Sequence, residues 1–198
     1  IVTVLADRSD GYTDVALLWA VAVSFTAMAL VTAFPEAATR FADRLLGNWS
    51  HVWTPGQLLT LVTALALIVF LATWALQLWQ PLKFALIPGP VRSARVRAAA
   101  VRHFKVGAER RTHGRTGVLL YLSMREHRAE IVADDAIAKL VDAEVWGEAM
   151  ADMLAEIRKG DIAGGLAAGV RDVGAVLAKH FPRDAQDTNE LPDRLIVV

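Results

Sequence analysis

The chain has 198 residues, of which 55% are hydrophobic, and its mean hydropathy of +0.37 is high for a soluble domain and typical of a domain joined to membrane-embedded segments. The absence of cysteine excludes disulfides, thiolate metal sites, iron–sulfur clusters and a thiol nucleophile. The net charge of zero hides an uneven layout: residues 83–115 hold nine Lys or Arg against one acid, and residues 116–198 hold fifteen acids against nine bases.

Residues 1–14 open with IVTVLA, an apolar run that is typical of a buried β-strand. The run lacks the basic start and the small-residue cleavage site of a signal peptide. We therefore expect residues 1–14 to supply the first strand and lead-in of a domain, and we expect the chain to begin inside that domain.

Two long runs without any charge follow, at residues 15–34 and 58–79. Each matches the roughly 20 residues that a helix needs to cross about 30 Å of hydrocarbon. Neither run has the polar stripe of a helix buried in a soluble core. The sequence predicts a transmembrane hairpin embedded in a lipid bilayer. The tryptophans near it are expected at the interface or in packing; they are Trp19, Trp53, Trp74 and Trp79.

The loop between the spans, residues 35–57, interleaves Phe41 and Leu45 with charges. This pattern is compatible with a short amphipathic helix on the membrane surface and equally with an ordinary connecting loop. The loop carries only Arg40 and Arg44 as basic residues, whereas the opposite flanks are richer in them. The positive-inside rule therefore predicts that both termini and the domain are cytoplasmic. The flanking basic residues are Arg8, Lys83, Arg92, Arg95 and Arg97.

Residues 80–92 are predicted to be a linker, because PGP at residues 88–90 interrupts a helix. Ser93 is then a candidate N-cap for a helix that extends to about residue 111. This helix has a basic face, for which anionic lipid headgroups and plain solvent are both compatible surroundings. Nucleic acid is disfavoured, since no helix-turn-helix or aromatic strand platform is evident. The basic residues are Arg92, Arg95, Arg97 and Arg102.

The rest of the domain, residues 93–198, continues with GVLLYLSM, REHR and AEIVA, which predict a β-hairpin. Two helices follow, with Asp142 and Asp161 as N-caps. Glycines in the second helix lack the spacing of a phosphate loop and indicate close helix packing. They are Gly164, Gly165, Gly169 and Gly174. The element order predicts an α/β layered domain whose first strand is separated from the rest by the membrane hairpin.

Four aspartates form the candidate site. Asp7 and Asp10 follow the first strand, and Asp134 and Asp135 follow the last strand of the predicted hairpin. Ligands gather beyond the carboxyl ends of parallel strands, and carboxylate oxygens suit Ca²⁺ or Mg²⁺. If these strands are parallel neighbours, the four carboxylates meet in a metal site. Turns and helix caps are the alternative explanation of the same residues. No histidine or serine shows a known catalytic spacing.

The segments TGVLLYLSMREHRAEIVADDAI, AEVW and NELPDR resemble the TPM domain family, which includes thylakoid-lumen, photosystem II repair and membrane-anchored bacterial proteins. The whole chain is similar to the bacterial membrane branch, in which two spans interrupt the domain. The resemblance implies an α/β/α sandwich, sometimes with calcium at a carboxylate-lined edge, and a phosphatase activity has been proposed for plant relatives.

Two functions are compatible with these features. The first is a bacterial inner-membrane accessory or assembly protein, whose domain docks without catalysis on a larger membrane complex such as a photosynthetic or respiratory one. The second is a metal-assisted phosphatase that uses Asp134 and Asp135.

Overall fold

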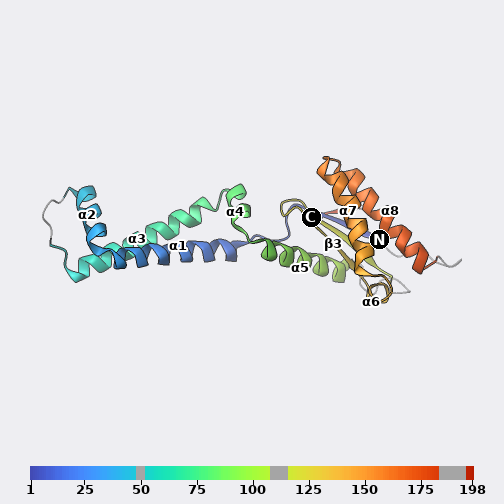
Figure 1. Ribbon diagram of the computed structural model, residues 1–198, viewed down its shortest axis with the longest axis horizontal. Helices are drawn as coiled ribbons and strands as arrows, with labels where there is room; N and C mark the ends of the chain where they lie inside the picture. Colours follow the sequence, from blue (N-terminus) through green and yellow to red (C-terminus); the bar gives the residue numbers. More distant parts are fainter. Residues whose placement is uncertain (48–51, 108–115, 183–194) are drawn as a thin grey trace. The chain divides into compact units, whose positions relative to one another are not determined.

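The computed structural model describes residues 1–47, 52–107, 116–182 and 195–198. The chain divides into two compact units. Residues 1–11 and 88–198 form the α/β unit, and residues 12–87 form the hairpin unit. Figure 1 labels the helices and the strand β3. The hairpin unit is therefore inserted in the sequence after the first strand of the α/β unit.

The α/β unit is built on a four-stranded sheet with the strand order β3-β2-β1-β4. The central strand β1 runs parallel to β2 and β4, and β3 runs antiparallel to β2. The register places Val4 opposite Tyr121. The β2–β3 hairpin confirms the sequence prediction. The strands are β1 Val2–Ala6, β2 Val118–Ser123, β3 Arg128–Ala133 and β4 Leu195–Val197.

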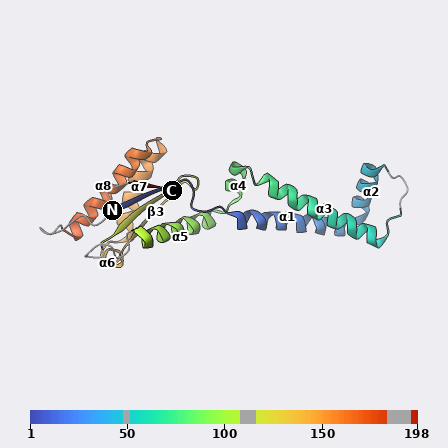
Figure 2. The same cartoon turned by 180° about the vertical axis from the view of Figure 1, so that it is seen from behind.

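Helices cover both faces of this sheet (Figure 2). On one face, α5 (Gly89–Gly107) packs against β1 and β2. On the other face, α7 (Ala143–Arg158) and α8 (Ile162–His180) enclose the alternate side chains of the same strands, next to the short helix α6 (Asp135–Ala138). The alternation of strand side chains fills both layers. This arrangement confirms the predicted α/β/α sandwich.

Two glycines allow α7 and α8 to pack closely. A Cβ atom on Gly165 would lie 2.7 Å from the backbone carbonyl oxygen of Met153, and one on Gly169 would lie 3.0 Å from the sulfur of that methionine. The packing role predicted from the sequence is confirmed at these two positions. It is wrong at Gly174, where a Cβ would meet nothing within 4 Å, and Gly164 faces the cap of its own helix.

The helix starts agree only in part with the sequence predictions. The carboxylate of Asp161 accepts a hydrogen bond of 2.7 Å from the N–H of Gly164 and so caps α8, as predicted. Asp142 occupies the N-cap position of α7, but its side chain makes no cap hydrogen bond. The cap therefore contributes less to α7 than the sequence pattern suggested.

Ser93 is not the N-cap of α5, because that helix already begins at Gly89. The hydroxyl of Ser93 donates a hydrogen bond of 3.2 Å to the carbonyl of Gly89, one turn earlier in the same helix. Pro90 fits this position, since a proline in the first turn loses no intrahelical hydrogen bond. Residues 108–111, which were predicted to belong to this helix, lie outside the described residues.

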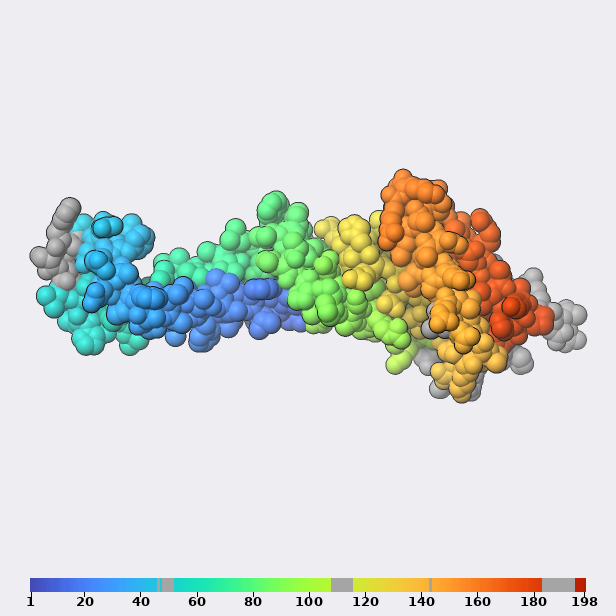
Figure 3. Space-filling view, viewed as in Figure 1, coloured from blue at the N-terminus to red at the C-terminus, as the bar shows by residue number. Residues whose placement is uncertain are grey.

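The described part of the hairpin unit contains two long helices and two short ones. Figure 3 shows α1 and α3 (blue and teal) in contact along their length. The end of α3 and the start of α4 differ from the predicted span 58–79 and linker 80–92, because a proline in the first turn starts a new helix there. The helices are α1 Thr13–Ala33, α2 Pro35–Leu46, α3 Pro55–Leu76 and α4 Gln80–Leu86.

Both long helices are long and apolar enough to cross a membrane. They contain 21 and 22 residues, with mean hydropathies of 2.2 and 2.4 over their most apolar windows. Only 17% and 6% of those windows are buried within the chain. A core helix of a soluble protein buries far more of its apolar side chains. The outward-facing apolar surface is typical of helices that face lipid.

Polar contacts join the two long helices of the hairpin unit. The side chain of Gln77 is buried, and its Nε2 donates a hydrogen bond of 2.9 Å to the carbonyl oxygen of Ala16. The hydroxyl of Ser24 donates one of 2.8 Å to the carbonyl oxygen of Ala66. In an apolar surrounding such contacts favour helix association, because the polar groups have no water as an alternative partner.

Candidate functional site

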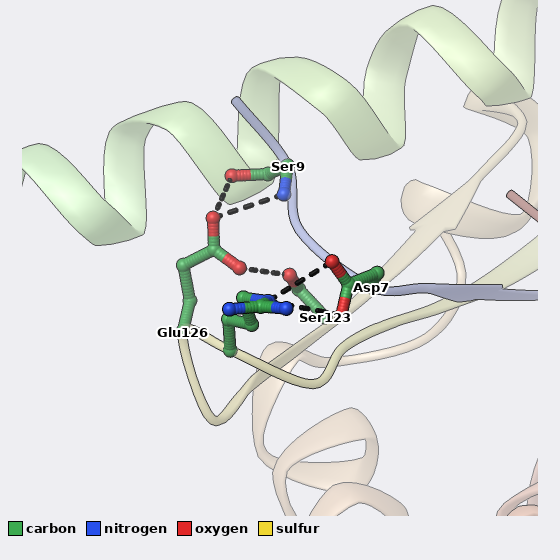
Figure 4. A network of polar contacts seen from close by, with 5 residues as sticks. Asp7, Ser9, Ser123 and Glu126 are labelled. Atoms are coloured by element: carbon green, nitrogen blue, oxygen red, sulfur yellow. Dashed lines mark hydrogen bonds and ion pairs between the residues drawn. The ribbon is translucent and has the colours of Figure 1, made fainter. Parts of the chain in front are cut away.

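Polar side chains from two distant segments meet at the carboxyl ends of β1 and β2 (Figure 4). One segment is the stretch after β1, and the other is the β2–β3 turn. Their backbones are tied together, because the N–H of Met124 donates to the carbonyl of Ala6 and the N–H of Arg125 donates to that of Asp7, each at 3.0 Å. The carboxyl ends of these two strands therefore present a fixed set of side chains.

Glu126 lies at the centre of this set and is only 2% exposed. One of its carboxylate oxygens accepts hydrogen bonds from the backbone N–H of Ser9 at 2.9 Å and from the Ser9 hydroxyl at 2.6 Å. The other oxygen accepts a hydrogen bond from the hydroxyl of Ser123. These donors offset the cost of burying the carboxylate. Glu126 thus fastens the segment after β1 to the β2–β3 turn.

The first two predicted metal ligands, Asp7 and Asp10, form ion pairs with arginines at the same end of the strands. Both carboxylate oxygens of Asp7 accept hydrogen bonds from the Nε of Arg125, at 2.9 and 3.0 Å. Asp10 forms an ion pair of 2.8 Å with Arg95, and its other oxygen accepts a hydrogen bond of 2.6 Å from the N–H of Gly11. Both aspartates therefore hold the chain where it leaves the sheet.

The other two predicted ligands lie at the opposite end of the strands. Because β3 runs antiparallel to β2, the residue after β3 lies beside the start of β2. Asp134 is buried there and accepts a hydrogen bond of 3.1 Å from the N–H of Gly117. Asp135 is exposed in the first turn of α6. The metal hypothesis required parallel strands, and this premise is wrong.

The two ends of β2, which has six residues, lie about 20 Å apart at ~3.3 Å per residue. Asp7 and Asp10 therefore do not meet Asp134 and Asp135 in one Ca²⁺ or Mg²⁺ site. Within the described residues, no group of three or more His, Asp or Glu is arranged to hold a metal ion. The carboxylate convergence that a metal-assisted phosphatase would need is not formed by these four side chains.

A histidine and a tyrosine stack between α5 and the sheet. The rings of His103 and Tyr121 have centroids 5.6 Å apart and an interplanar angle of 26°. Burial, and then the positive charge of Arg102, lower the pKa of His103. Burial, and then the negative charge of Glu126, raise the pKa of Tyr121. Both shifts favour the neutral form of the ring, which suits packing against the sheet.

A groove of about 470 Å³ runs along the outer side of β3. Among the described residues, this strand is at the edge of the sheet and pairs with β2 alone. The walls of the groove come from α5, α6, α7 and β3 itself. An ion pair of 3.4 Å between Arg97 and Glu130 contributes charge to its lining. The apolar lining includes the half-buried side chains of Val101, Trp146 and Met150.

The fold and this site define a class: an α/β/α sandwich that is interrupted after its first strand by a pair of apolar helices. Residues 92–176 match the family model described as the TPM domain. This part of the chain is therefore similar to a TPM domain, as the sequence resemblance indicated. The match extends from α5 into α8. The segment NELPDR, residues 189–194, lies outside the described residues.

One solved structure to which the chain is similar is the NMR structure of the BA42 protein from the psychrophilic bacterium Bizionia argentinensis. The two are 26% identical, and the superposition has a TM-score of 0.47 and covers 52% of this chain and 71% of that one. A search of curated proteins found no match to the chain.

Proposed function

We propose that the chain is an accessory or assembly protein of the bacterial inner membrane, whose TPM domain docks on a larger membrane complex without catalysing a reaction. Two helices that are long and apolar enough to cross a membrane support the membrane location. The carboxylates after β1 support a structural role, since they bind Arg95 and Arg125 of the chain itself.

The groove beside β3 is the observation that carries the docking role. An edge strand offers backbone N–H and C=O groups to a further strand, and the addition of an extended segment is a common mode of peptide recognition. Trp146 and Met150 line this groove, and side chains of these types are enriched in protein–protein interfaces. We infer that an extended segment of the partner complex binds there. A photosynthetic or respiratory complex is the class of partner that suits a membrane-tethered domain.

The basic face of α5 is proposed to bind anionic lipid headgroups. Arg95 and Arg97 form ion pairs with acidic residues of the same unit, which reduces the charge they offer. Arg92 is half-buried, and Arg102 is exposed. Arg102 is therefore the residue through which anionic lipid would act most strongly.

The docking proposal is tested by filling the groove without disturbing the fold. Gly147 lines the groove on α7, and a Cβ there would meet nothing within 4 Å. Gly147→Arg therefore places a large side chain in the groove, and it also removes a glycine from a helix, which favours folding. Gly174→Arg is the matched control, because Gly174 is equally unobstructed but is not part of the groove.

The measurement is mass spectrometry of the proteins that co-migrate with the tagged chain on a native gel after mild detergent extraction. We expect a stoichiometric membrane complex with the unaltered chain and with Gly174→Arg, and its loss with Gly147→Arg. Migration of the unaltered chain alone would refute the accessory role. Retention of the complex by Gly147→Arg would refute the groove as its binding surface.

A further inference from the structure

We propose that α2 is an interfacial helix, which lies along the membrane surface at the connected end of α1 and α3 with its apolar side in the lipid boundary. This inference rests on the membrane insertion of α1 and α3 in the proposed function and assigns a partner, the bilayer surface, to a different element. It follows from the direction of α2, from the distribution of its side chains and from the contact that holds its far end.

The direction of α2 is set by a one-residue turn. The helix α1 ends at Ala33, and α2 begins at Pro35, so only Phe34 separates them. Phe34 has φ −128° and ψ 60°, because a proline disfavours the helical conformation in the residue before it. Figures 1 and 2 show α2 turned across the end of the α1–α3 pair. If that pair spans a membrane, a helix turned in this way runs along its surface.

The side chains of α2 separate into two faces. At 100° per residue, the apolar residues Phe41, Ala42 and Leu45 fall on one side of the helix, and the charged residues fall on the other. Ala42 is buried against the hairpin unit, whereas Phe41 is 64% and Leu45 is 71% exposed. The charged residues are Glu36, Arg40, Asp43 and Arg44. A short helix with a charged face and a separate apolar face is typical of the membrane interface.

Exposed apolar side chains are also present at the end of α1 and in the turn that leads to α2. Leu30 on the last turns of α1 is 56% exposed, and Phe34 in the turn is 64% exposed. Phe41 and Leu45 on the apolar side of α2 are exposed as well, and at 100° per residue no charged residue of α2 falls between them. Lipid is therefore the partner that covers these apolar side chains. Acyl chains contact those of α1, and the boundary between acyl chains and headgroups contacts those of α2.

The segment that returns from α2 is also fixed. The indole N–H of Trp53 donates a hydrogen bond of 3.0 Å to the carboxylate of Asp43 on the polar side of α2. The next residue, Thr54, caps α3 and shares a capping box with Gln57. Tryptophan is enriched at membrane interfaces, where its ring is apolar and its N–H needs a polar partner. The turn at Phe34 and the contact of Trp53 thus hold α2 at one depth.

The absence of cysteine makes a direct measurement possible. Single cysteines are introduced in the full chain, labelled with a nitroxide and reconstituted in vesicles of phosphatidylcholine and phosphatidylglycerol. The relative collision rates with oxygen and with a water-soluble nickel chelate then report depth. Leu45→Cys tests the apolar side of α2, and Arg40→Cys is the matched control on its polar side. Leu67→Cys, in the middle of α3 and 58% exposed, tests membrane insertion itself.

We expect the ratio of oxygen to nickel collision rates to be highest at position 67 and severalfold lower at position 45. At position 40 we expect nickel collisions to exceed oxygen collisions. Equal nickel accessibility at positions 45 and 40, with position 67 deep in the bilayer, would overturn the interfacial helix while the membrane insertion stands. Nickel accessibility at position 67 would instead overturn the membrane insertion and, with it, this inference.

Discussion

The segment after β1 and the β2–β3 turn are separated by more than a hundred residues, and the buried side chain of Glu126 joins them. Ser9 and Ser123 contribute the donors, one from each segment. A buried carboxylate that loses its donors is costly, so this contact requires both segments to be in place. The side chain of Glu126 therefore holds the segment between β1 and the hairpin unit against the sheet.

Glu126→Gln should destabilise the α/β unit by about 1–3 kcal/mol, because an amide nitrogen replaces an oxygen that accepts hydrogen bonds from the serines. Thermal unfolding of the full chain in detergent measures the effect. The substitution also removes the charge that raises the pKa of Tyr121, so the tyrosinate absorbance of that residue should appear at a lower pH.

Glu130→Gln serves as the matched control for Glu126→Gln. Glu130 pairs at 3.4 Å with Arg97, whose side chain is 72% exposed, and such pairs contribute at most about 1 kcal/mol. Equal unfolding temperatures for the two variants, with the pKa of Tyr121 unchanged, would contradict the role assigned to Glu126.

His103 should make the stability of the α/β unit depend on pH. Burial lowers its pKa in the folded protein, so the unfolded chain binds a proton more readily. Stability is therefore fully present above the ordinary histidine pKa of about 6.5 and decreases as the pH falls through and below that value. His103→Phe keeps a ring against Tyr121 and removes the titration. Melting temperatures between about pH 8 and pH 5 should fall less for this variant; parallel curves would contradict the prediction.

The sequence located part of this site and missed its centre. Asp7 and Asp10 were found because they follow a recognisable apolar strand, but their arginine partners lie far away in the sequence. Glu126 was missed because the turn REHR is charged throughout and is therefore typical of a solvated turn. Its burial arises only when the segment after β1 lies over the turn, and local sequence contains no signal for that contact.

Among the elements, the α7–α8 pair gives the sharpest test of packing. Gly165→Ala should destabilise the α/β unit by about 1–3 kcal/mol, because the new methyl group would lie 2.7 Å from a backbone oxygen of α7 and the helices would have to separate. Gly174→Ala, in the same helix with nothing within 4 Å, should stabilise by about 0.5–1 kcal/mol through helix propensity. Unfolding midpoints of the full chain measure both, and shifts of the same sign would refute the assignment.

The elements themselves were largely predictable. Apolar patterns identified β1, β2, β3 and the long helices, and the family resemblance implied the α/β/α sandwich, whereas β4 was not predicted. The helix α5 begins four residues before the predicted cap, and α4 lies in the predicted linker. For α5, the PGP segment was interpreted as the end of a helix, although Pro90 also fits the first turn of one. For α4, Pro81 was assigned to the predicted linker, but it instead lies in the first turn of a new helix. Which of the two applies depends on packing that the local sequence does not determine.

At the scale of the whole molecule, the insertion of the hairpin unit constrains how the chain can cross a membrane. The strand β1 precedes the insertion, yet it lies between β2 and β4, which both follow it. The sheet can form only if β1 and the residues from 88 onward are on the same side of the membrane. Two spans satisfy this condition, whereas one span would separate β1 from its neighbours. If the chain crosses a membrane within the hairpin unit, the fold therefore requires an even number of crossings there.

The remaining choice is which side the α/β unit occupies, and the Lys/Arg bias predicts the cytoplasm. Arg44→Cys, in the connecting helix α2, should react with a membrane-impermeant maleimide in intact cells whose outer barrier has been opened. Lys139→Cys, exposed on the α/β unit, should react only after the inner membrane is permeabilised. The reverse pattern would place the TPM domain outside the cytoplasm, and its partner surface with it. Equal reactivity of both positions before permeabilisation would mean that α1 and α3 do not span the membrane, since the fold itself forbids a single crossing.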